Sequence, residues 1–438
     1  MKILTIVNDI LTLGLVVPIL VVFGIYLTVR LGFPQITRLG TSIRDLIRTE
    51  RDSQGNMSNF EAISAVLAGN LGTGNISGTA MAISLGGPGA LFWMWVMAIL
   101  GAIIKYASCF LGVSYRAKNQ KGDYVGGPMF YLANGCHQHW LAIAFCIFSI
   151  ITAFTVGNVV QVNSVILPVS ALGVHPLVAG VTLAVLVWLV LLRDMRCFAK
   201  VASAVVPLMA FFYLAGACFI LFLYAHRIPG AVNLVFKEAF RLKAASGGFI
   251  GFGVMKSIIV GFERGVLATD AGLGIASVLQ SEARTKSPME EGTVAMIAPW
   301  LVMIVCSITA LVLLTTGAWN QPGLQSTKMC TWAFQQGMGK AWAQHLVTIT
   351  LMLFAYTTIL AWAYCAKRCV EYMGQQQWVR IFYYFFIGII PLGALIRVEL
   401  AWALADTSAS LMLLVNVAGI IILSSQIIQE SQFSIKEG

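Results

Sequence analysis

Two long apolar segments of this chain are interrupted by glycine and polar residues, and this pair of interruptions constrains the fold more than any other feature. The first covers residues 65–78 and the second covers residues 261–274. A helix that faces lipid cannot leave backbone N–H and C=O groups unpaired, so irregular backbone at membrane depth survives only where it lines a protein cavity. Two such breaks in corresponding places of the two halves of a hydrophobic chain indicate a binding site between the halves.

The composition is that of an integral membrane protein. Of the 438 residues, 58% are hydrophobic and 11% are charged, and the mean hydropathy is +0.84. A soluble domain cannot bury that much apolar surface. The net charge of +10 would suit nucleic acid, but excess Lys and Arg in a membrane protein is explained by topology. The cysteines show no zinc-type spacing, and the 136–139 Cys-His cluster has no partners nearby, so we expect no transition-metal site.

About eleven apolar stretches are long enough to cross the roughly 30 Å of membrane hydrocarbon. They cover approximately residues 5–30, 59–84, 89–115, 139–167, 174–192, 201–225, 248–280, 292–316, 344–372, 379–397 and 405–427. We therefore predict an all-α polytopic membrane protein that forms a single transporter domain over 1–438. The first stretch lacks a small-residue cleavage site and is predicted to be a retained span.

The distribution of basic residues predicts the orientation. Most Lys and Arg fall on segments that would then be cytoplasmic, which places the N-terminus outside and the C-terminus in the cytoplasm. The basic residues of 227–243 oppose this assignment, although longer outer loops are translocated regardless of charge. The basic stretch 31–58 is expected to be either an amphipathic helix on the cytoplasmic membrane interface or a solvated linker.

Without the first stretch, the remaining spans divide into two sets of five. The first repeat covers 59–225 and the second covers 248–427, and each opens with one of the interrupted segments. An odd number of spans in each half gives the halves opposite orientations, which is the arrangement of inverted-repeat transporters. The two halves show no residue-by-residue repeat, so this prediction depends on topology and on the interruptions.

The first interruption combines glycine with polar residues. Each glycine lowers helix stability by about 1 kcal/mol relative to alanine, so several together favour local unwinding. Unwound carbonyls can hold a cation, and N–H groups at a half-helix N-terminus can hold a carboxylate. Gly74 and Gly78 also form a GxxxG pair that could serve helix packing alone. The interleaved polar residues favour a binding site: Asn70, Thr73, Asn75 and Ser77.

The second interruption places Glu263, Arg264 and Asp270 at membrane depth. Charges there are costly and usually functional. They could instead face a layer of water or pair structurally among themselves. Lys105, inside the third predicted span, either has a buried partner or extends towards the cytoplasmic interface.

Two further polar groups lie within predicted spans. Thr357 and Thr358 could complete an oxygen cage for a small monovalent cation with carbonyls of the first interruption, or could bond back to their own helix. Asn158, Gln161 and Asn163 could face a cavity or join helices.

The motifs together resemble the alanine/glycine:cation symporters. The resemblance is carried by Gly72-Thr73-Gly74-Asn75-Ile76, by the glycine- and tryptophan-rich stretch 86–95, by Lys105-Tyr106-Ala107, by Gly126-Gly127-Pro128-Met129, and by 157–161, 264–274, 306–311 and 354–362. It implies the amino-acid/sodium symporter fold, with five-plus-five inverted repeats, in the plasma membrane (the bacterial inner membrane). It also implies import of L- or D-alanine or glycine with Na⁺ or H⁺, without enzymatic activity or an organic cofactor.

The resemblance and the breaks suggest a binding site. The substrate carboxylate is expected against the backbone of Thr73 to Asn75. The predicted substrate-binding residues are Thr73, Gly74, Asn75, Asn158, Gln161, Asp270 and Trp362, with Phe154 as a further pocket wall. The predicted cation-binding residues are Ala68 and Leu71, through their carbonyls, and Thr357 and Thr358, through their hydroxyls.

The chain also departs from the family pattern. Ser108 stands where Glu is usual, Thr269-Asp270 where Asn-Glu is usual, Leu301-Val302 where Asp-Thr is common, and Cys365-Ala366-Lys367 where Tyr-Gly-Glu is usual. These departures affect the coupling ion and the substrate range rather than the class of protein. A channel would need continuous polar rings, and a membrane enzyme would need clustered histidines or carboxylates, so a secondary symporter is predicted.

Overall fold

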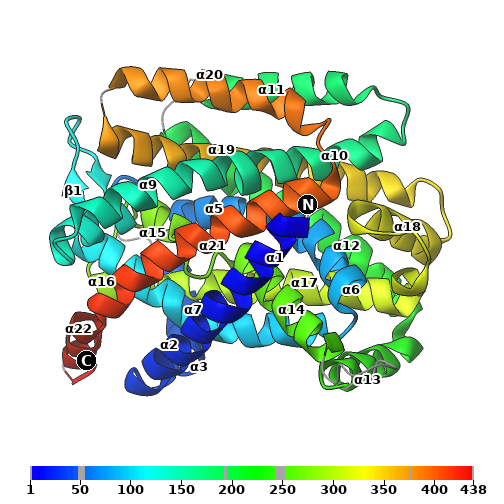
Figure 1. The fold of residues 1–438 in the computed structure, drawn as a ribbon, viewed down its shortest axis with the longest axis horizontal. Coiled ribbons are helices and arrows are strands. Elements are labelled where there is room, and N and C mark those ends of the chain that lie inside the picture. The colour runs from blue at the N-terminus through cyan, green and yellow to red at the C-terminus, as the bar shows by residue number, and fades with distance from the viewer. Residues whose placement is uncertain (1, 48–54, 192–194, 242–251, 375, 437–438) are drawn as a thin grey trace.

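The computed structural model describes residues 2–47, 55–191, 195–241, 252–374 and 376–436. Within these ranges the protein is almost entirely helical (Figure 1). The exception is a short antiparallel hairpin in which β1 (Ala117–Lys118) pairs with β2 (Tyr124–Val125), with Ala117 opposite Val125. Residues 48–54 of the predicted interfacial segment and residues 248–251 of the predicted seventh span lie outside the described part.

The N-terminal half contains the following helices in order: α1 (Lys2–Leu11), η1 (Thr12–Val16), α2 (Val17–Arg30), α3 (Pro34–Thr37), α4 (Leu39–Ile47), α5 (Asn59–Asn70), η2 (Thr73–Asn75), α6 (Ser77–Gly86), α7 (Ala90–Ser114), α8 (Pro128–Phe130), η3 (Tyr131–Gly135), α9 (His139–Phe154), η4 (Thr155–Val159), α10 (Val160–Ser170), α11 (Pro176–Leu191) and α12 (Met195–Leu223). Of these, η1, η3 and η4 are π-helical turns and η2 is a 3₁₀ turn.

The C-terminal half follows with these helices: η5 (Ala225–Arg227), α13 (Ile228–Ala239), α14 (Phe252–Thr269), α15 (Ile275–Gln280), α16 (Pro288–Ala295), α17 (Ile297–Thr316), η6 (Ala318–Asn320), α18 (Ser326–Met338), α19 (Ala343–Met373), α20 (Gln376–Gly393), α21 (Val398–Ile422) and α22 (Ser424–Lys436).

Among the described residues, seven helical stretches are long and apolar enough to cross a membrane, which confirms the all-α polytopic class. They are Ile6–Arg30, Ala90–Ser114, His139–Ser170, Cys197–Leu223, Pro288–Thr316, Ala343–Met373 and Val398–Ile422. Two shorter apolar helices, α11 and α20, coincide with two further predicted spans. The predicted spans 59–84 and 248–280 coincide with α5–α6 and with α14–α15, and both are broken. The number of crossings and the two repeats stay predictions.

The last predicted span is displaced in the structure. The sequence predicts a helix over 405–427, whereas α21 already begins at Val398 and ends at Ile422. Trp402, Ala405 and Asp406 are buried, so this helix packs its first turns into the protein. The apolar residues after 422 belong to α22, which a turn separates from α21.

The first break has a local steric cause. Helix α5 begins with a capping box between Ser58 and Glu61 and ends at Asn70. Gly72 then adopts an extended conformation, and a Cβ atom there would lie 2.8 Å from the Thr358 hydroxyl. Only glycine lets the chain pass α19 this closely. After the η2 turn, α6 continues the segment from Ser77.

The second break is made by left-handed backbone. Asp270, Gly272 and Gly274 all have positive φ values, of 55°, 80° and 92°. Glycine tolerates this conformation, whereas an aspartate there is uncommon and needs supporting contacts. The chain therefore leaves α14 at Thr269 and restarts as the short helix α15 at Ile275.

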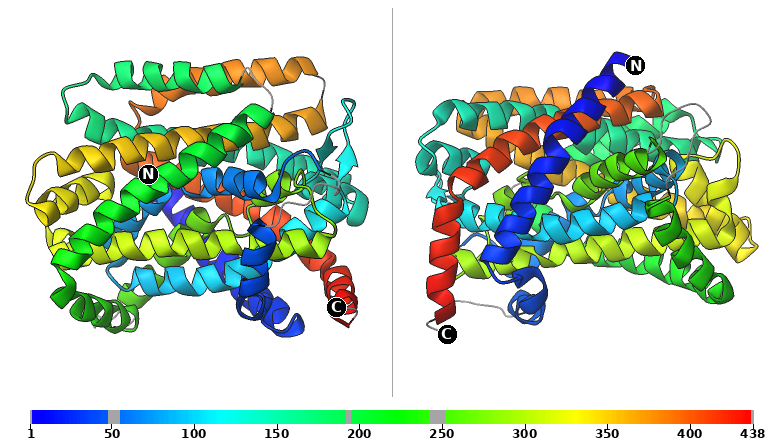
Figure 2. Two further views of the ribbon diagram at one scale, coloured as in Figure 1. Left: turned by 180° about the vertical axis from the view of Figure 1, so that it is seen from behind. Right: turned by 60° about the horizontal axis from the view of Figure 1, so that its bottom comes forward.

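The elements around the breaks form a layered bundle. Helices α11 and α20 pair as a layer outside α9 and α19, as Figure 1 shows. The N-terminal helices α1 and α2 lie along the other side, where α1 contacts α21 and α2 contacts α7 (Figures 1 and 2). Helices α5 and α12 both pack on α19, so the first break is enclosed by other helices.

Candidate functional site

Gln161 caps the first break. It lies on α10, directly after the π-helical turn η4, and its Oε1 accepts hydrogen bonds from the Thr73 N–H and the Thr73 hydroxyl, both at 3.0 Å. Its Nε2 donates to the Val156 carbonyl at 3.0 Å, which fixes the direction of the amide. Thr73 and Gln161 are buried. The structure therefore brings these two predicted site residues together, with the amide oxygen of Gln161 on the backbone N–H of Thr73.

Thr358 meets the carbonyl end of α5. Its hydroxyl donates to the Ala68 carbonyl at 2.8 Å, although the two residues are 290 positions apart in the chain. Gly72 lies against the same hydroxyl and against the Gln161 Oε1. Two of the predicted cation ligands are thus adjacent, and both are oxygen atoms, the ligand type that hard cations prefer.

The other two predicted cation ligands are placed differently. The Thr357 hydroxyl donates to the Leu353 and Phe354 carbonyls of its own helix, each at 3.1 Å, and faces the Met209 sulfur. The structure does not bring it to Ala68. Leu71 is buried directly after α5, and its N–H donates to the Leu67 carbonyl.

Gly74 and Asn75 have separate roles in the turn. Gly74 is half-buried, and a Cβ atom built on it would meet no atom of the described residues within 4 Å. This is where the backbone of the break borders open space. The Asn75 side chain is fully buried and donates to the Asn70 carbonyl at 2.6 Å, while its Oδ1 accepts from the Cys306 thiol. Asn75 therefore stabilises the turn from within.

The predicted pocket walls divide into two groups. Trp362 is buried and packs against Gly157 of η4 so closely that any Cβ at 157 would overlap its ring. Phe154 instead packs edge-on against Phe382 and at a tilt against Phe386, both on α20, at ring-centroid distances of 5.7 and 5.5 Å. Asn158 donates to the Phe386 carbonyl at 2.7 Å. Phe154 and Asn158 thus contact α20, which belongs to the layer formed by α11 and α20.

Lys105 joins the two breaks. Its ammonium group is 1% exposed, donates to the Thr269 carbonyl at 2.8 Å and lies 3.8 Å from the Asp270 carboxylate. With the Asn70 amide in the orientation that satisfies both its atoms, Asn70 Oδ1 accepts from Lys105 at 2.6 Å. The alternative that Lys105 extends towards the interface is therefore wrong, because its partners are buried.

Asp270 caps the second break. Its Oδ2 accepts from the Ala276 N–H at 2.8 Å, at the start of α15, and the same oxygen faces Lys105. These contacts support its left-handed backbone and neutralise its charge. Asp270 thus has a structural role at the start of α15, and its place among substrate ligands stays a prediction.

The charges of α14 pair with other elements than expected. Glu263 accepts hydrogen bonds from Asn8 and Thr12 of the N-terminal helix, and Arg264 forms an ion pair with Asp406 of α21. The Arg264 guanidinium also lies over the Trp402 ring, 4.3 Å from its centroid. The alternative that these charges pair with each other or with Asp270 is therefore wrong, since their partners come from distant parts of the chain.

The family departures occupy defined places. The Ser108 hydroxyl contacts the Tyr131 hydroxyl at 3.2 Å, and Tyr131 in turn bonds to Asn416. Asn416 donates to the Gly272 carbonyl at 2.9 Å, so this chain of polar groups ends at the second break. Leu301 is 37% exposed on the outer surface of α17, where an apolar residue suits lipid.

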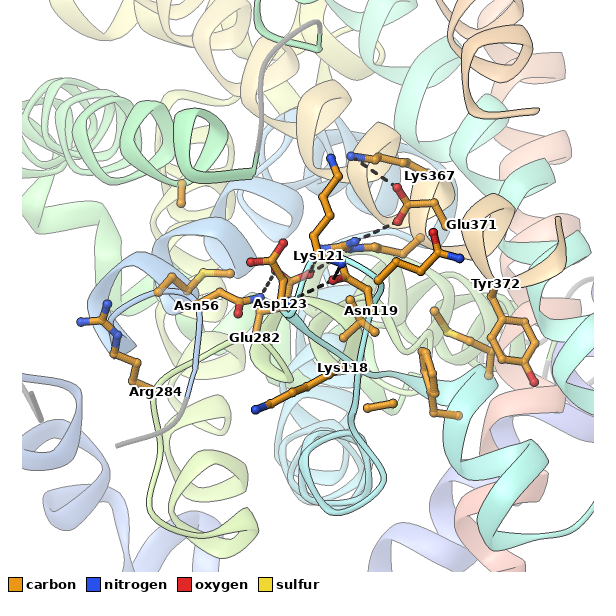
Figure 3. A pocket seen from close by; sticks show the side chains of 18 of the residues that line it. Asn56, Lys118, Asn119, Lys121, Asp123, Glu282, Arg284, Lys367, Glu371 and Tyr372 are labelled. Carbon is orange, nitrogen blue, oxygen red and sulfur yellow. Dashed lines mark hydrogen bonds and ion pairs between the residues drawn. The ribbon is translucent and has the colours of Figure 1, made fainter. Parts of the chain in front are cut away.

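A large polar cavity of about 1020 Å³ opens at one end of the bundle (Figure 3). It lies between the β1–β2 hairpin, the residues before α5, the end of α15 and the end of α19. Its charged lining residues are Glu61, Lys118, Lys121, Asp123, Lys200, Glu282, Arg284, Lys367, Arg368 and Glu371. Several of these charged groups are joined by hydrogen bonds, among them Glu282, Arg368 and Glu371.

Glu282 holds the elements around this cavity together. Its carboxylate accepts from Arg368 at 2.8 and 3.0 Å, from Asn56 at 3.0 Å, and from the Tyr364 hydroxyl. Its backbone carbonyl accepts from the Asn56 N–H at 2.8 Å. Sequence reasoning missed this cluster, because only the proximity of Glu282 to the second interruption pointed to it.

Comparison with known proteins identifies the family of this chain. Residues 1–434 match the sequence model of the Sodium:alanine symporter family. The chain is 36% identical over 422 residues to the sodium/alanine symporter AgcS of Methanococcus maripaludis, covering 93% of this chain and 91% of that relative. It is 30% identical over 427 residues to the probable sodium/glutamine symporter GlnT of Bacillus subtilis, covering 95% and 87%.

Solved structures share the fold at low sequence identity. A manganese transporter from Eremococcus coleocola superposes with a TM-score of 0.55 and 14% identity, covering 83% of this chain and 80% of that one. A Na⁺-coupled sialic acid symporter gives a TM-score of 0.53 and 13% identity, covering 87% and 80%. At these identities the likeness is one of fold, and it confirms that the bundle is a membrane transporter fold.

Proposed function

Because the chain belongs to the sodium:alanine symporter family, we propose that it is a secondary symporter that imports a small neutral amino acid, alanine or glycine, together with Na⁺. The observation that carries this proposal is the contact between the Thr358 hydroxyl and the Ala68 carbonyl, directly beside the Thr73–Gln161 bond. It supports a cation site and a carboxylate site that share one unwound turn. Ion and substrate would then stabilise the same local conformation.

The cation is assigned to the oxygen atoms at the end of α5. The Ala68 carbonyl and the Thr358 hydroxyl supply two ligands, and the Leu71 carbonyl is the further candidate on the same turn. Thr357 is left out of this assignment because its hydroxyl faces Met209. Na⁺ suits several neutral oxygens, whereas a proton would need an ionisable group.

The substrate carboxylate is assigned to the N–H groups of the η2 turn at Gly74. This is where the break borders open space and where the N-terminus of α6 contributes positive potential. Gln161 holds the neighbouring Thr73 N–H and its amide lies within the same site. Trp362 is proposed as the wall that limits side-chain size.

The polar cavity is proposed as the cytoplasmic exit path. Its many Lys and Arg side chains agree with the positive-inside rule, which also supports an outer N-terminus and a cytoplasmic C-terminus. The Glu282 cluster then closes the path between this cavity and the breaks. Alternating access would require the hydrogen bonds of Glu282 to break.

Uptake into proteoliposomes tests this proposal. Labelled alanine, glycine, serine and glutamine are compared with Na⁺ or with K⁺ outside, at several pH values. Saturable alanine uptake that needs Na⁺ and exchanges with internal alanine is expected. Glutamine uptake that exceeds alanine uptake would replace the proposed substrate, and a current that does not saturate would contradict a carrier.

A further inference from the structure

Three sets of polar groups from distant parts of the chain meet beside α14, the first part of the second broken helix. Asn8 and Thr12 come from α1 and η1, Glu263 and Arg264 from α14, and Asp406 from α21. Figures 1 and 2 show the N-terminal helix lying along α21 at this place. The cluster is separate from the residues assigned to Na⁺ and to the substrate.

The hydrogen bonds to Glu263 converge on one of its two oxygens. Asn8 Nδ2 donates to Oε1 at 2.7 Å, and Thr12 Oγ1 donates to the same Oε1 at 3.0 Å. A protonated carboxyl group has one carbonyl oxygen that accepts and one hydroxyl oxygen that donates. The observed pattern fits a neutral Glu263 whose Oε1 is the carbonyl oxygen and whose Oε2 carries the proton.

Asp406 offers an acceptor for that proton. One of its oxygens is engaged by Arg264, while Oδ1 is buried and has no hydrogen-bond partner among the described residues. Glu263 and Asp406 line the same small cavity of about 10 Å³, together with Thr12 and Ser410. That volume is about one water molecule in size, so a single water can bridge the two carboxyl groups.

Among the described residues, this cluster has one negative charge in excess when both of its carboxyl groups are ionised. Glu263 and Asp406 carry two negative charges when ionised, and Arg264 supplies one positive charge. Nearby, Asp9 on α1 is exposed and interacts with Lys256 on α14, while Lys105 of α7 faces Asp270 at the far end of α14. An uncompensated carboxylate at membrane depth is costly. Protonation of one carboxyl group removes this cost.

We propose that Glu263 is a proton-binding site, with its proton shared towards Asp406, and that it is distinct from the Na⁺ site at Ala68 and Thr358. The proton comes from water and adds to the carboxylate of Glu263 without any other bond change. When Glu263 is protonated, Arg264 stays on Asp406 and holds α14 to α21. When the proton leaves, two carboxylates compete for Arg264, and the contact between these helices weakens.

Infrared difference spectroscopy of the purified protein tests proton binding directly. Raising the pH should remove the carbonyl stretch of a protonated carboxyl group in the parent protein. Glu263→Gln should lack this change, whereas Glu399→Gln, which alters an exposed carboxylate at the start of α21, should keep it. A parent-like loss of this band on raising the pH of Glu263→Gln would overturn the proposal. This measurement needs no transport and is independent of the proposed substrate.

The transport arm depends on the proposed function. Glutamine at position 263 imitates the protonated group, since its Oε1 can accept from Asn8 and Thr12. Glu263→Gln should keep Na⁺-driven uptake but lose the several-fold pH dependence expected of the parent, while Glu399→Gln should retain that dependence. A parent-like pH profile in Glu263→Gln overturns the site. Failure of alanine uptake in the parent itself would instead overturn the proposed substrate and leave the infrared result standing.

Discussion

At the scale of single residues, two neighbours in the sequence make different contacts in the structure. Thr357 and Thr358 are indistinguishable as sequence signals, yet only the Thr358 hydroxyl meets Ala68. Adjacent residues on a helix point about 100° apart, and the sequence does not fix how a fully buried helix is rotated. Residue types at the breaks could therefore be predicted, but the direction of each side chain could not.

The two threonines give a matched pair of variants. Thr358→Ala should raise the Na⁺ concentration for half-maximal uptake by about tenfold, because losing one good ligand corresponds to roughly 1.4 kcal/mol. Thr357→Ala removes a hydroxyl bonded within its own helix and should change the Na⁺ dependence little. Equal effects of the two variants would argue against the assigned cation site. Uptake measured over a series of Na⁺ concentrations decides between these outcomes.

Gly74 gives a steric test of the carboxylate site. Gly74→Val should abolish uptake while leaving the protein in the membrane, because the added side chain enters the open space next to the η2 turn. Gly388→Val on α20 is the control, since a Cβ there also meets no atom within 4 Å. Normal uptake by Gly74→Val, at equal amounts of protein in the membrane, would show that the carboxylate binds elsewhere.

Trp362 tests the limit on substrate size. Trimming it to alanine should widen the range towards larger aliphatic amino acids, since an apolar pocket discriminates one methylene by only about 1–3 kcal/mol. The ring packs on Gly157, so its loss leaves space at the π-helical turn. Competition by 2-aminobutyrate and valine against alanine uptake measures the effect. A variant that folds and keeps the parent's selectivity would remove Trp362 from the pocket.

At the scale of elements, the two breaks could be predicted from the sequence, but the side-chain contacts that hold them could not. Clustered glycines with polar neighbours identified both interruptions, because helical backbone is weakest there. The partner of Lys105 lies 164 positions away on another helix, and no local pattern encodes that pairing. The same holds for Glu263 with Asn8 and for Glu282 with Arg368.

The buried pair of Lys105 and Asp270 should stabilise the second break. Lys105→Met leaves Asp270 buried without its cation and should cost about 3–5 kcal/mol of stability. Asp270→Asn combined with Lys105→Met should recover much of this loss, since no buried charge remains unpaired. Thermal unfolding in detergent compares both variants with the parent protein. If the double variant is no more stable than Lys105→Met, the pair does not act as a unit.

At the scale of the whole molecule, the apolar pattern predicted the fold class but not where each helix packs. The displacement of the last span to Val398–Ile422 illustrates this, because its first turns are buried by tertiary contacts that hydropathy cannot register. Hydropathy and charge bias also predict which side of the membrane each end of the chain faces. The cavity at the end of the bundle provides the means to test it.

Cysteine labelling from one side of the membrane tests this orientation. Lys121, on the hairpin beside the cavity, and Lys328, on α18, are both exposed. In a background without the accessible cysteines Cys197 and Cys218, an impermeant maleimide should label Lys328→Cys in intact cells and Lys121→Cys only in inverted vesicles. Because the positive-inside rule places the basic hairpin in the cytoplasm, the reverse pattern would invert the proposed topology and turn the cavity into an entrance.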